Sequence, residues 1–280
     1  MSVEPGTAPC TVGGLIGVVH LPGLPGDPRP LAGGFPAARR FANRDADALI
    51  EGGVDAIIVE NFGSAPFVKG GPSEPLPHHQ LAFMAEVVGD LVRRSPIPIG
   101  VNCLRNDASA AMGIAAATGA SFVRVNVHTG AYVTDQGLIE GRAAETLRYR
   151  RSLDAEHVQI LADVLVKHAR PLGELSVDDA VQDTLARGLA DGVIVSGRAT
   201  GAAVDEDTLA KALSVAGSGR LFIGSGLTPE ISLDWAPKLR GAIVGTWLKE
   251  NGRLSAPVDA SRVATFADAV RGRWYPEEAA

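Results

Sequence analysis

Short apolar runs rich in β-branched residues alternate along this chain with longer stretches of helical spacing. Eight of the runs predict strands, near residues 15–20, 56–60, 97–102, 122–127, 159–166, 192–196, 221–224 and 241–245. Helices are predicted between them, for example over 36–53, 79–95, 107–119, 143–153 and 177–190. Several runs are apolar throughout, which is typical of strands buried on both faces of a parallel sheet.

Strand–helix alternation predicts a parallel sheet with right-handed crossovers. Eight such units in a chain of this length match a closed (β/α)8 TIM barrel, which typically takes about 250 residues. An open doubly wound sheet is the alternative, but no G-x-G-x-x-G motif follows the first strand. No linker divides the chain. We therefore expect one barrel over residues 13–273, a flexible N-terminal tail over 1–12 and a C-terminal tail over 274–280.

Polar residues end most of the rows that would face the inside of this barrel. Residues two apart share a face of a strand, and the carboxyl ends of barrel strands carry the active site. The rows end in His20, Glu60, Asn102, Arg124 with Asn126 and His128, Asp163 with Lys167, and Ser196. A packed core does not require these residues, so their convergence predicts a site. We expect His20, Glu60, Arg124, Asn126, His128, Asp163 and Lys167 to be catalytic.

Lys167 admits two interpretations at this stage. Asp163 and Lys167 lie four apart on one strand face, so a buried ion pair would keep the ammonium charged. Alternatively, burial would lower the pKa of Lys167 and free its amine for Schiff-base chemistry. We favour a charged Lys167 that stabilises negative charge on a ligand. His20 has a simpler alternative as a core histidine.

Two neighbouring strands end in glycine-rich turns that carry hydroxyl groups. Gly224, Ser225 and Gly226 follow the seventh strand, and Gly245 and Thr246 follow the eighth. These are the loops that hold phosphate in many TIM barrels, together with the N-terminus of a short helix. Tight turns alone also favour glycine. Because both loops are built alike, we predict a phosphate site between them.

Three long connections, 21–36, 62–78 and 129–142, should cover the mouth of the barrel. The second has glycines around Lys69 and reads as a lid that places a cation on an anionic ligand. A plain surface loop is the alternative. The first contains several prolines and should form a stiff wall.

Composition narrows the classes of partner. The chain has 280 residues, a net charge of −6 and 5% aromatic residues, which argues against nucleic acid. No apolar run is long enough to span a bilayer, and no secretory signal is visible, so we expect a cytoplasmic protein without membrane insertion. H-E-x-x-H and C-x-x-C motifs are absent. No cofactor is required by these patterns, although Mg²⁺ held by Glu60 and Asp163 is a weaker alternative.

Several motifs together resemble those of the BtpA/SgcQ family. They include HLPGLPGDP (20–28), DAIIVENFGSAPF (55–67), GVNCLRND (100–107), FVRVNVHTGAYVTDQGLIEGRA (122–143), ADVLVKHA (162–169), IVSGRATG (194–201) and IGSGLTPE (223–230). The founding member is named for photosystem I biogenesis, and a relative is provisionally labelled a nucleoside triphosphatase. The resemblance implies a fold like the ribulose-phosphate-binding barrels. It also adds Asn61, Thr129 and Asp135 to the candidate binding residues, beside Asn102, Ser196 and Lys69. Trp247 stands where the resemblance implies a small residue, so its indole would narrow the phosphate mouth.

Two classes of function follow from these observations. The first is an enzyme that uses acid–base chemistry, of the isomerase, lyase or hydrolase type, on a phosphorylated sugar or nucleotide-like molecule. The second is a non-catalytic assembly factor for a membrane protein complex, as the family name suggests. A scaffold has no use for an inner ring of charges, and no exposed apolar patch is evident from the sequence. We therefore favour the enzyme, and we expect it to be a homo-oligomer.

Overall fold

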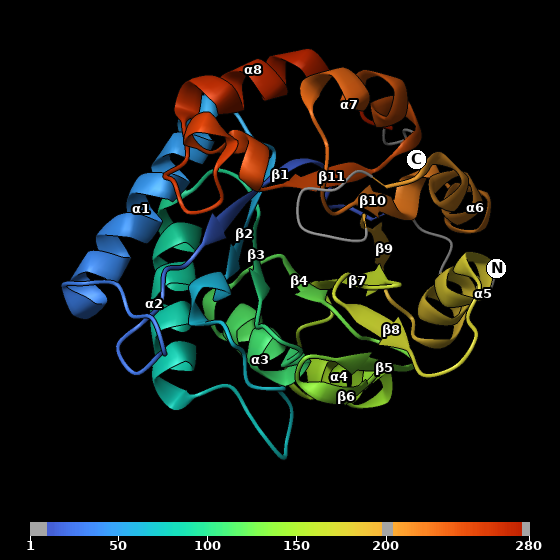
Figure 1. Cartoon of the computed structure of the whole chain (residues 1–280), viewed down its shortest axis with the longest axis horizontal. Coiled ribbons are helices and arrows are strands. Elements are labelled where there is room, and N and C mark those ends of the chain that lie inside the picture. The colour runs from blue at the N-terminus through green and yellow to red at the C-terminus, as the bar shows by residue number, and fades with distance from the viewer. Residues whose placement is uncertain (1–9, 198–203, 276–280) are drawn as a thin grey trace.

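The computed structural model describes residues 10–197 and 204–275 and shows a closed barrel of parallel strands (Figure 1). The barrel order is β1-β11-β10-β9-β7-β4-β3-β2. The strands are β1 (Gly14–His20), β2 (Ala56–Glu60), β3 (Ile99–Asn102), β4 (Phe122–Val125), β7 (Gln159–Val164), β9 (Gly192–Val195), β10 (Leu221–Ile223) and β11 (Gly241–Val244). All eight predicted strands are present, and β10 pairs with β11. The predicted TIM barrel is therefore confirmed.

An outer ring of helices surrounds the barrel (Figure 1). These are α1 (Gly34–Gly52), α2 (His78–Arg94), α3 (Ala108–Thr118), α4 (Ala143–Ser152), α5 (Val177–Gln182), α6 (Glu206–Ala216), α7 (Pro229–Trp235) and α8 (Ala260–Val270). A π-helical turn, Asp183–Arg187, continues α5. Local sequence explains several starts: the Asp107 side chain accepts a hydrogen bond from the Ala110 N–H at the start of α3, and Thr228 caps α7 before Pro229.

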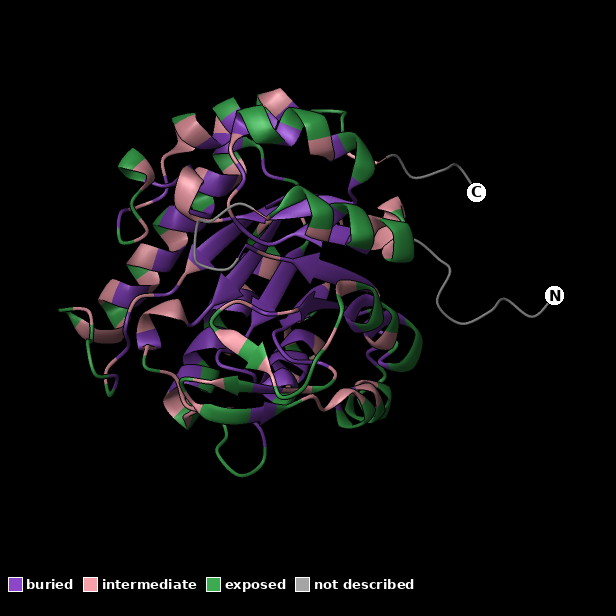
Figure 2. Ribbon diagram, turned by 45° about the vertical axis from the view of Figure 1, so that its right-hand side comes forward, coloured by how far each residue is buried: buried purple, intermediate pink, exposed green. Residues whose placement is uncertain are grey.

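The buried apolar residues form two layers, one inside the barrel and one between the strands and the helices. Figure 2 shows the buried strands inside and the exposed outer sides of the helices. One buried cluster fills the barrel interior and contains Ile16, Val18, Ile58, Phe122, Leu161, Ile194, Phe222 and Ile243. Gly100 makes room for this layer, because a Cβ there would lie 2.3 Å from the ring of Phe122. The inner row of each strand is thus the one predicted from two-residue alternation, and its polar end points to the mouth.

The amino-terminal end of the barrel is closed by a segment that the sequence assigned to a tail. Cys10 and Val12 are buried in the barrel cluster, and Gln159 accepts hydrogen bonds from the Cys10 thiol and the Val12 N–H. The prediction of a flexible tail is therefore wrong for residues 10–12, because these apolar side chains cover the barrel floor. The rest of that tail, 1–9, lies outside the described residues.

The predicted C-terminal tail is also partly ordered. The Tyr275 N–H donates to the Leu239 carbonyl oxygen, and Trp274 packs against the main core, so residues 274 and 275 belong to the barrel domain. Residues 276–280 lie outside the described part of the chain.

A small antiparallel sheet was not predicted. Within the connection 129–142, β5 (Ala131–Thr134) and β6 (Gly137–Glu140) form a hairpin, and β8 (Ala169–Pro171), which follows β7, pairs with β5. Tyr132 and Ile139 on one face pack with Val127 and Val166. This sheet joins the connections after β4 and β7 into one structured cover beside the mouth of the barrel.

Candidate active site

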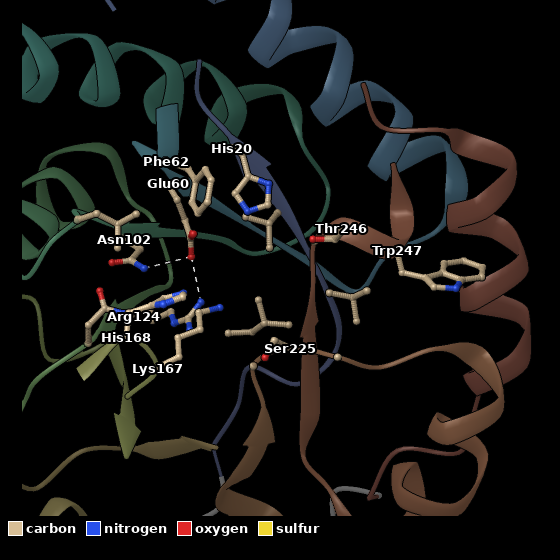
Figure 3. Close-up of a pocket in the computed structure, with 18 of the residues that line it drawn as sticks. His20, Glu60, Phe62, Asn102, Arg124, Lys167, His168, Ser225, Thr246 and Trp247 are labelled. Carbon is tan, nitrogen blue, oxygen red and sulfur yellow. Dashed lines mark hydrogen bonds and ion pairs between the residues drawn. The ribbon is translucent and has the colours of Figure 1, made fainter. Parts of the chain in front are cut away.

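A cavity of about 510 Å³ opens at the carboxyl ends of the strands (Figure 3). Twelve of the residues predicted for the site line it: His20, Glu60, Asn102, Arg124, Asn126, Asp135, Lys167, Gly224, Ser225, Gly226, Gly245 and Thr246. They come from strands far apart in the sequence and meet because parallel barrel strands all end at the same rim.

Arg124 lies at the centre of a buried network at the end of β4. Its Nε and Nη2 atoms donate to the two oxygens of Asp163 at 3.0 and 2.9 Å, and its Nη1 donates to Glu60 Oε1 at 3.1 Å. Asn126 Nδ2 donates to Asp163 Oδ2 at 2.7 Å, and Asn102 Nδ2 donates to Glu60 Oε1 at 3.1 Å. Burial by itself would lower the pKa of Arg124, but Asp163 and then Glu60 raise it above its ordinary value. The guanidinium is permanently charged.

The two carboxylates of the network differ in how many of their oxygens accept hydrogen bonds. Both oxygens of Asp163 accept hydrogen bonds from Arg124, and Oδ2 also accepts one from Asn126. Glu60 accepts its two hydrogen bonds at Oε1 alone, so Oε2 has no partner among the described residues. Glu60 Oε2 can therefore accept a proton from a ligand, whereas both oxygens of Asp163 are bonded to Arg124.

His20 ends β1 on the same rim. Its ring packs edge-on against Phe62, with 4.8 Å between the centroids, and its Nδ1 is buried without a hydrogen-bond partner among the described residues. Burial lowers the pKa of His20 well below its ordinary 6.5, and the positive charges of Lys249 and Lys167 lower it further. His20 is therefore a neutral imidazole, able to exchange a proton with a ligand.

The two glycine-rich turns line the same cavity at the ends of β10 and β11 (Figure 3). Ser225 Oγ is buried and has no hydrogen-bond partner among the described residues. Because buried polar groups are normally hydrogen-bonded, this hydroxyl is a candidate to bind a ligand. Gly226 adopts φ +76, a conformation that suits glycine.

Close approach explains the other two glycines. A Cβ on Gly224 would lie 2.5 Å from Ser196 Oγ, and a Cβ on Gly245 would lie 2.7 Å from His20 Cε1. These turns therefore need glycine because they pack closely against Ser196 and His20. Glycine would also let their backbone approach an anion.

Trp247 lines the cavity, but its indole is held at one side. The ring packs edge-on against Phe266 of α8, with 5.4 Å between the centroids, and the guanidinium of Arg262 lies 4.3 Å from its centre. Figure 3 shows the indole directed away from Ser225 and Glu60. Contacts with α8 therefore keep the ring to the side, and narrowing of the phosphate mouth by Trp247 stays a prediction.

Lys167 lines the cavity from the turn after β7, and not from the strand as predicted. β7 ends at Val164 and Leu165 adopts φ 48, so the alternation that placed Lys167 on the strand face of Asp163 is broken. Asp163 is bonded to Arg124, and no carboxylate of the described chain forms an ion pair with Lys167. Burial lowers the pKa of Lys167, and Arg124 lowers it further, against weaker opposite effects of Asp163 and Glu60. The predicted Asp163–Lys167 ion pair is wrong.

Two residues predicted for the mouth turn away from it. β4 ends at Val125, so the inner row does not continue to His128. His128 Nε2 is 2.8 Å from the Gly188 carbonyl oxygen, and Thr129 Oγ1 is 3.0 Å from Thr184 Oγ1. Neither side chain lines the cavity. They join the end of β4 to the segment after α5, so the predicted catalytic role of His128 does not fit its position.

Asn61 and Lys69 also lie outside the cavity lining. The Asn61 side chain is bonded to the backbone N–H and carbonyl of Leu104 and to Gln80, so it fixes the turn after β3. The carbonyl oxygen of Lys69 accepts the N–H of Asn106 at 3.1 Å, which anchors the expected lid to that same turn. The connection contributes a wall to the cavity through Phe62, Ala65 and Phe67 instead of a cation.

Ser196 lies just behind the cavity lining. Its Oγ is buried and has no hydrogen-bond partner among the described residues, and it faces Gly224. Residues 198–201 of the IVSGRATG motif lie outside the described part of the chain. The hydroxyl of Ser196 therefore lies against Gly224, and direct ligand contact by Ser196 stays a prediction.

Sequence reasoning missed Arg105 and His168, which both line the cavity. Arg105 Nη2 donates to the Lys167 carbonyl oxygen at 2.9 Å, and His168 follows Lys167 with φ 58. Both residues lie in turns beyond the strand ends, where two-residue alternation no longer applies. The available signal was a charged or titratable side chain close after a predicted site residue: Arg105 is three residues after Asn102, and His168 directly follows Lys167.

The carboxylates are arranged around a guanidinium. Within residues 10–197 and 204–275, no group of three or more His, Cys, Asp or Glu side chains could hold a metal ion. Arg124 stands between Glu60 and Asp163, where the weaker alternative placed Mg²⁺. Mg²⁺ that binds together with a phosphorylated ligand stays a prediction.

The fold and the cavity define a (β/α)8 barrel whose candidate site lies at the carboxyl ends of its strands. A sequence model of the BtpA family matches residues 11–272, and the chain belongs to this family. The photosystem I biogenesis protein BtpA of Synechocystis is 46% identical over 256 residues, covering 91% of this chain and 87% of that protein. An uncharacterised Pyrococcus furiosus protein is also 46% identical, over 249 residues, covering 89% and 91%.

Solved structures of similar fold are TIM-barrel enzymes of low sequence identity. The phosphoribosyl anthranilate isomerase of Thermococcus kodakaraensis matches with a TM-score of 0.54 and 14% identity, over 93% of this chain and all of that one. An archaeal fructose 1,6-bisphosphate aldolase matches with a TM-score of 0.53 and 14% identity, over 93% and 94%. At these identities the matches show the fold alone. No helix in the described part of the chain is both long and apolar enough to cross a membrane.

Proposed function

We propose that this chain is an enzyme that performs acid–base chemistry on a phosphorylated sugar or nucleotide-like small molecule. The observation that carries the proposal is that acid–base groups and two glycine-rich turns line one cavity. Arg124 and Glu60 lie at the ends of β4 and β2, the turns of Ser225 and Thr246 follow β10 and β11, and His20 lies beside Gly245. The similar folds of enzymes that are named for phosphorylated compounds agree with the proposal as analogy.

The turns at Gly224–Gly226 and Gly245–Thr246 would hold the phosphate, through backbone N–H groups and the unpartnered Ser225 hydroxyl. Glu60 Oε2 is the candidate general base and His20 the candidate proton donor or acceptor. Arg124 would stabilise negative charge that develops on the substrate, held in place by Asp163 and Asn126. Asn102 and Asp135 are the candidate contacts to the remainder of the substrate.

A thermal-shift panel tests this proposal. Sugar phosphates and nucleotides, with and without Mg²⁺, are compared with the same compounds lacking phosphate. We expect phosphorylated compounds alone to raise the melting temperature, because a ligand that binds only the folded state stabilises it. Ser225→Ala should weaken the shift, whereas Ser214→Ala, an exposed serine on α6, should not. Equal shifts with and without phosphate would contradict the proposal.

A second candidate function, docking on an assembly partner, is favoured by one surface. Val133, Leu138 and Leu172 are 50%, 41% and 65% exposed. Val133 pairs directly with Leu138 across the β5–β6 hairpin, and Leu172 follows β8 beside it. The expectation that no exposed apolar patch exists is therefore wrong, because the unpredicted sheet carries one. This face would suit either an assembly partner or the second subunit of the expected homo-oligomer.

Sedimentation of the wild type and of Leu138→Lys distinguishes these two uses. If the wild type is an oligomer that Leu138→Lys dissociates, the face is a subunit contact and the assembly-factor proposal loses its docking surface. If the wild type is a monomer, the homo-oligomer prediction fails and the face is free for another partner.

A further inference from the structure

The segment that carries Lys167 is held in an unusual backbone conformation. Leu165 and His168, on either side of it, adopt φ 48 and φ 58, a region that residues other than glycine rarely occupy. Such conformations persist where the surroundings impose them, and they cluster at active sites. The chain here turns from β7 in the barrel to β8 in the small sheet within four residues.

Three contacts fix this segment. Val164 pairs with Val195 in the barrel, Arg105 Nη2 donates to the Lys167 carbonyl oxygen at 2.9 Å, and Ala169 pairs with Thr134 in the small sheet. The backbone of Lys167 is thus clamped from both flanks while its side chain lines the cavity beside Arg124 (Figure 3). This placement presents the amine to a ligand at a defined point.

The charges around Lys167 favour a free amine. Arg124 and Arg105 supply permanent positive charge nearby, and Glu60 and Asp163 are already bonded to Arg124. Burial lowers the pKa of Lys167, and Arg124 lowers it further. A lysine that is desolvated next to other cations is activated as a nucleophile.

We propose that Lys167 forms a Schiff base with an aldehyde or ketone group of the substrate, an inference that rests on the proposed function and narrows it to carbonyl compounds that carry a phosphate. The Nζ lone pair attacks the carbonyl carbon, and a carbinolamine forms. The carbonyl oxygen then leaves as water, taking one proton from the nitrogen and one from the medium, so that C=N replaces C=O. Glu60 and His20 line the same cavity and are placed to move these protons.

Reductive trapping with pyridoxal 5′-phosphate, which carries an aldehyde and a phosphate ester, tests the inference. Sodium borohydride converts the imine to a stable secondary amine by adding hydride to carbon. At neutral pH we expect mass spectrometry to find the label on Lys167, at about tenfold or more the level on Lys211, whose pKa is raised by its bond to Asp207. Lys167→Arg should remove that label and leave the far-ultraviolet circular dichroism unchanged.

Pyridoxal, which lacks the phosphate, separates failure of this inference from failure of the proposed function. Preferential labelling of Lys167 by pyridoxal 5′-phosphate, reduced by added inorganic phosphate, supports both. Equal labelling by the two aldehydes supports the reactive amine and contradicts the phosphate site. If Lys167 is labelled no faster than Lys211 while phosphorylated compounds still stabilise the wild type, the Schiff-base inference is overturned and the proposed function stands.

Discussion

At the scale of single residues, the site depends on the Arg124 guanidinium, which forms ion pairs with the carboxylates of Glu60 and Asp163. Arg124, Glu60 and Asp163 are 4%, 5% and 5% exposed, so their charges have little access to water. Burying charge is costly unless it is paired and hydrogen-bonded, and the fork of Arg124 satisfies both oxygens of Asp163. This arrangement supports a cationic centre that keeps its position when a ligand binds.

Arg124→Met should therefore destabilise the fold strongly. Removing one member of a buried ion pair leaves the partner charge uncompensated and typically costs about 3–5 kcal/mol. Arg124→Lys retains the charge but loses the fork, so its free energy of unfolding should lie between those of the wild type and Arg124→Met. Urea denaturation measures all three. A stability of Arg124→Met within about 1 kcal/mol of the wild type would contradict the network as described.

The neutral histidines predict a pH dependence of stability. Burial lowers the pKa of both His20 and His128 in the folded protein below their ordinary 6.5. Below pH 6.5 the unfolded chain binds protons that the folded protein does not, so the free energy of unfolding falls as pH falls. Each histidine contributes a slope of up to about 1.4 kcal/mol per pH unit.

Denaturant unfolding between pH 7.5 and 5.5 measures this slope. His20→Phe should flatten it by removing one contributing group, beside His128 and the more exposed His168, whose pKa is also lowered. Replacement of the exposed His157 by glutamine is the control variant. A wild-type stability that is constant across this range would show that His20 and His128 accept protons in the folded protein as readily as in the unfolded chain.

Parity along a strand predicted the inner residues well as long as the strand continued. His20, Glu60, Asn102 and Arg124 all lie within or at the end of regular strands, and all line the cavity. His128 failed the same reasoning, because β4 stops three residues earlier and the chain turns. Alternation within a regular strand predicts which side chains face the barrel interior, but it predicts nothing for the irregular turns that follow.

At the scale of elements, the two glycine turns should bind the phosphate. Gly226→Ala forces a side chain into φ +76, which costs about 1–2 kcal/mol and displaces the backbone N–H groups beside Ser225. Loss of one hydrogen bond to a charged group is worth about 1.5–3 kcal/mol, so phosphate binding should weaken by about tenfold or more.

Gly217→Ala is the matched control. Gly217 has φ +71 and open space around its Cβ position, at the C-terminal end of α6. It should show a similar loss of stability with unchanged binding of inorganic phosphate, followed by phosphorus-31 NMR. Equal binding by the two variants and the wild type would remove Gly226 from the phosphate site.

The small sheet shows where element prediction from sequence ends. Its strands have three or four residues each, and they pair across a long separation, Val133 with Arg170. The local sequence pattern does not reveal such pairing, because strands this short offer too few residues to show an alternating apolar row. The barrel strands were predictable because burial on both faces made them apolar throughout.

At the scale of the whole molecule, a second buried ion pair joins the beginning and end of the barrel. Lys249 Nζ lies 3.2 Å from Asp45 Oδ2, and neither side chain is exposed. Asp45 lies on α1, and Lys249 lies in the connection after β11 that also carries Trp247 and Gly252 to the cavity. The pair thus fastens one wall of the site to the first helix.

Lys249→Met should destabilise the fold by up to about 3–5 kcal/mol, because the buried Asp45 would keep only the half-exposed Arg44 as a cationic partner. Adding Asp45→Leu should recover part of this loss, since an apolar pair of similar volume needs no compensation, although the Val258 N–H then loses its acceptor. Chemical denaturation of the two single variants and the double variant measures the coupling. Additive losses would show that the pair does not act as a unit.

The central claim is that the cavity holds a phosphorylated ligand with its phosphate on the glycine turns and its reacting part at Glu60 and Lys167. A crystal structure of the protein with a sugar phosphate that raises its melting temperature tests this claim most directly. We expect phosphate oxygens at about 3 Å from the Ser225 hydroxyl and from backbone N–H groups of Gly226 and Thr246. A phosphate bound against Arg105 instead, or outside the barrel mouth, would contradict the account.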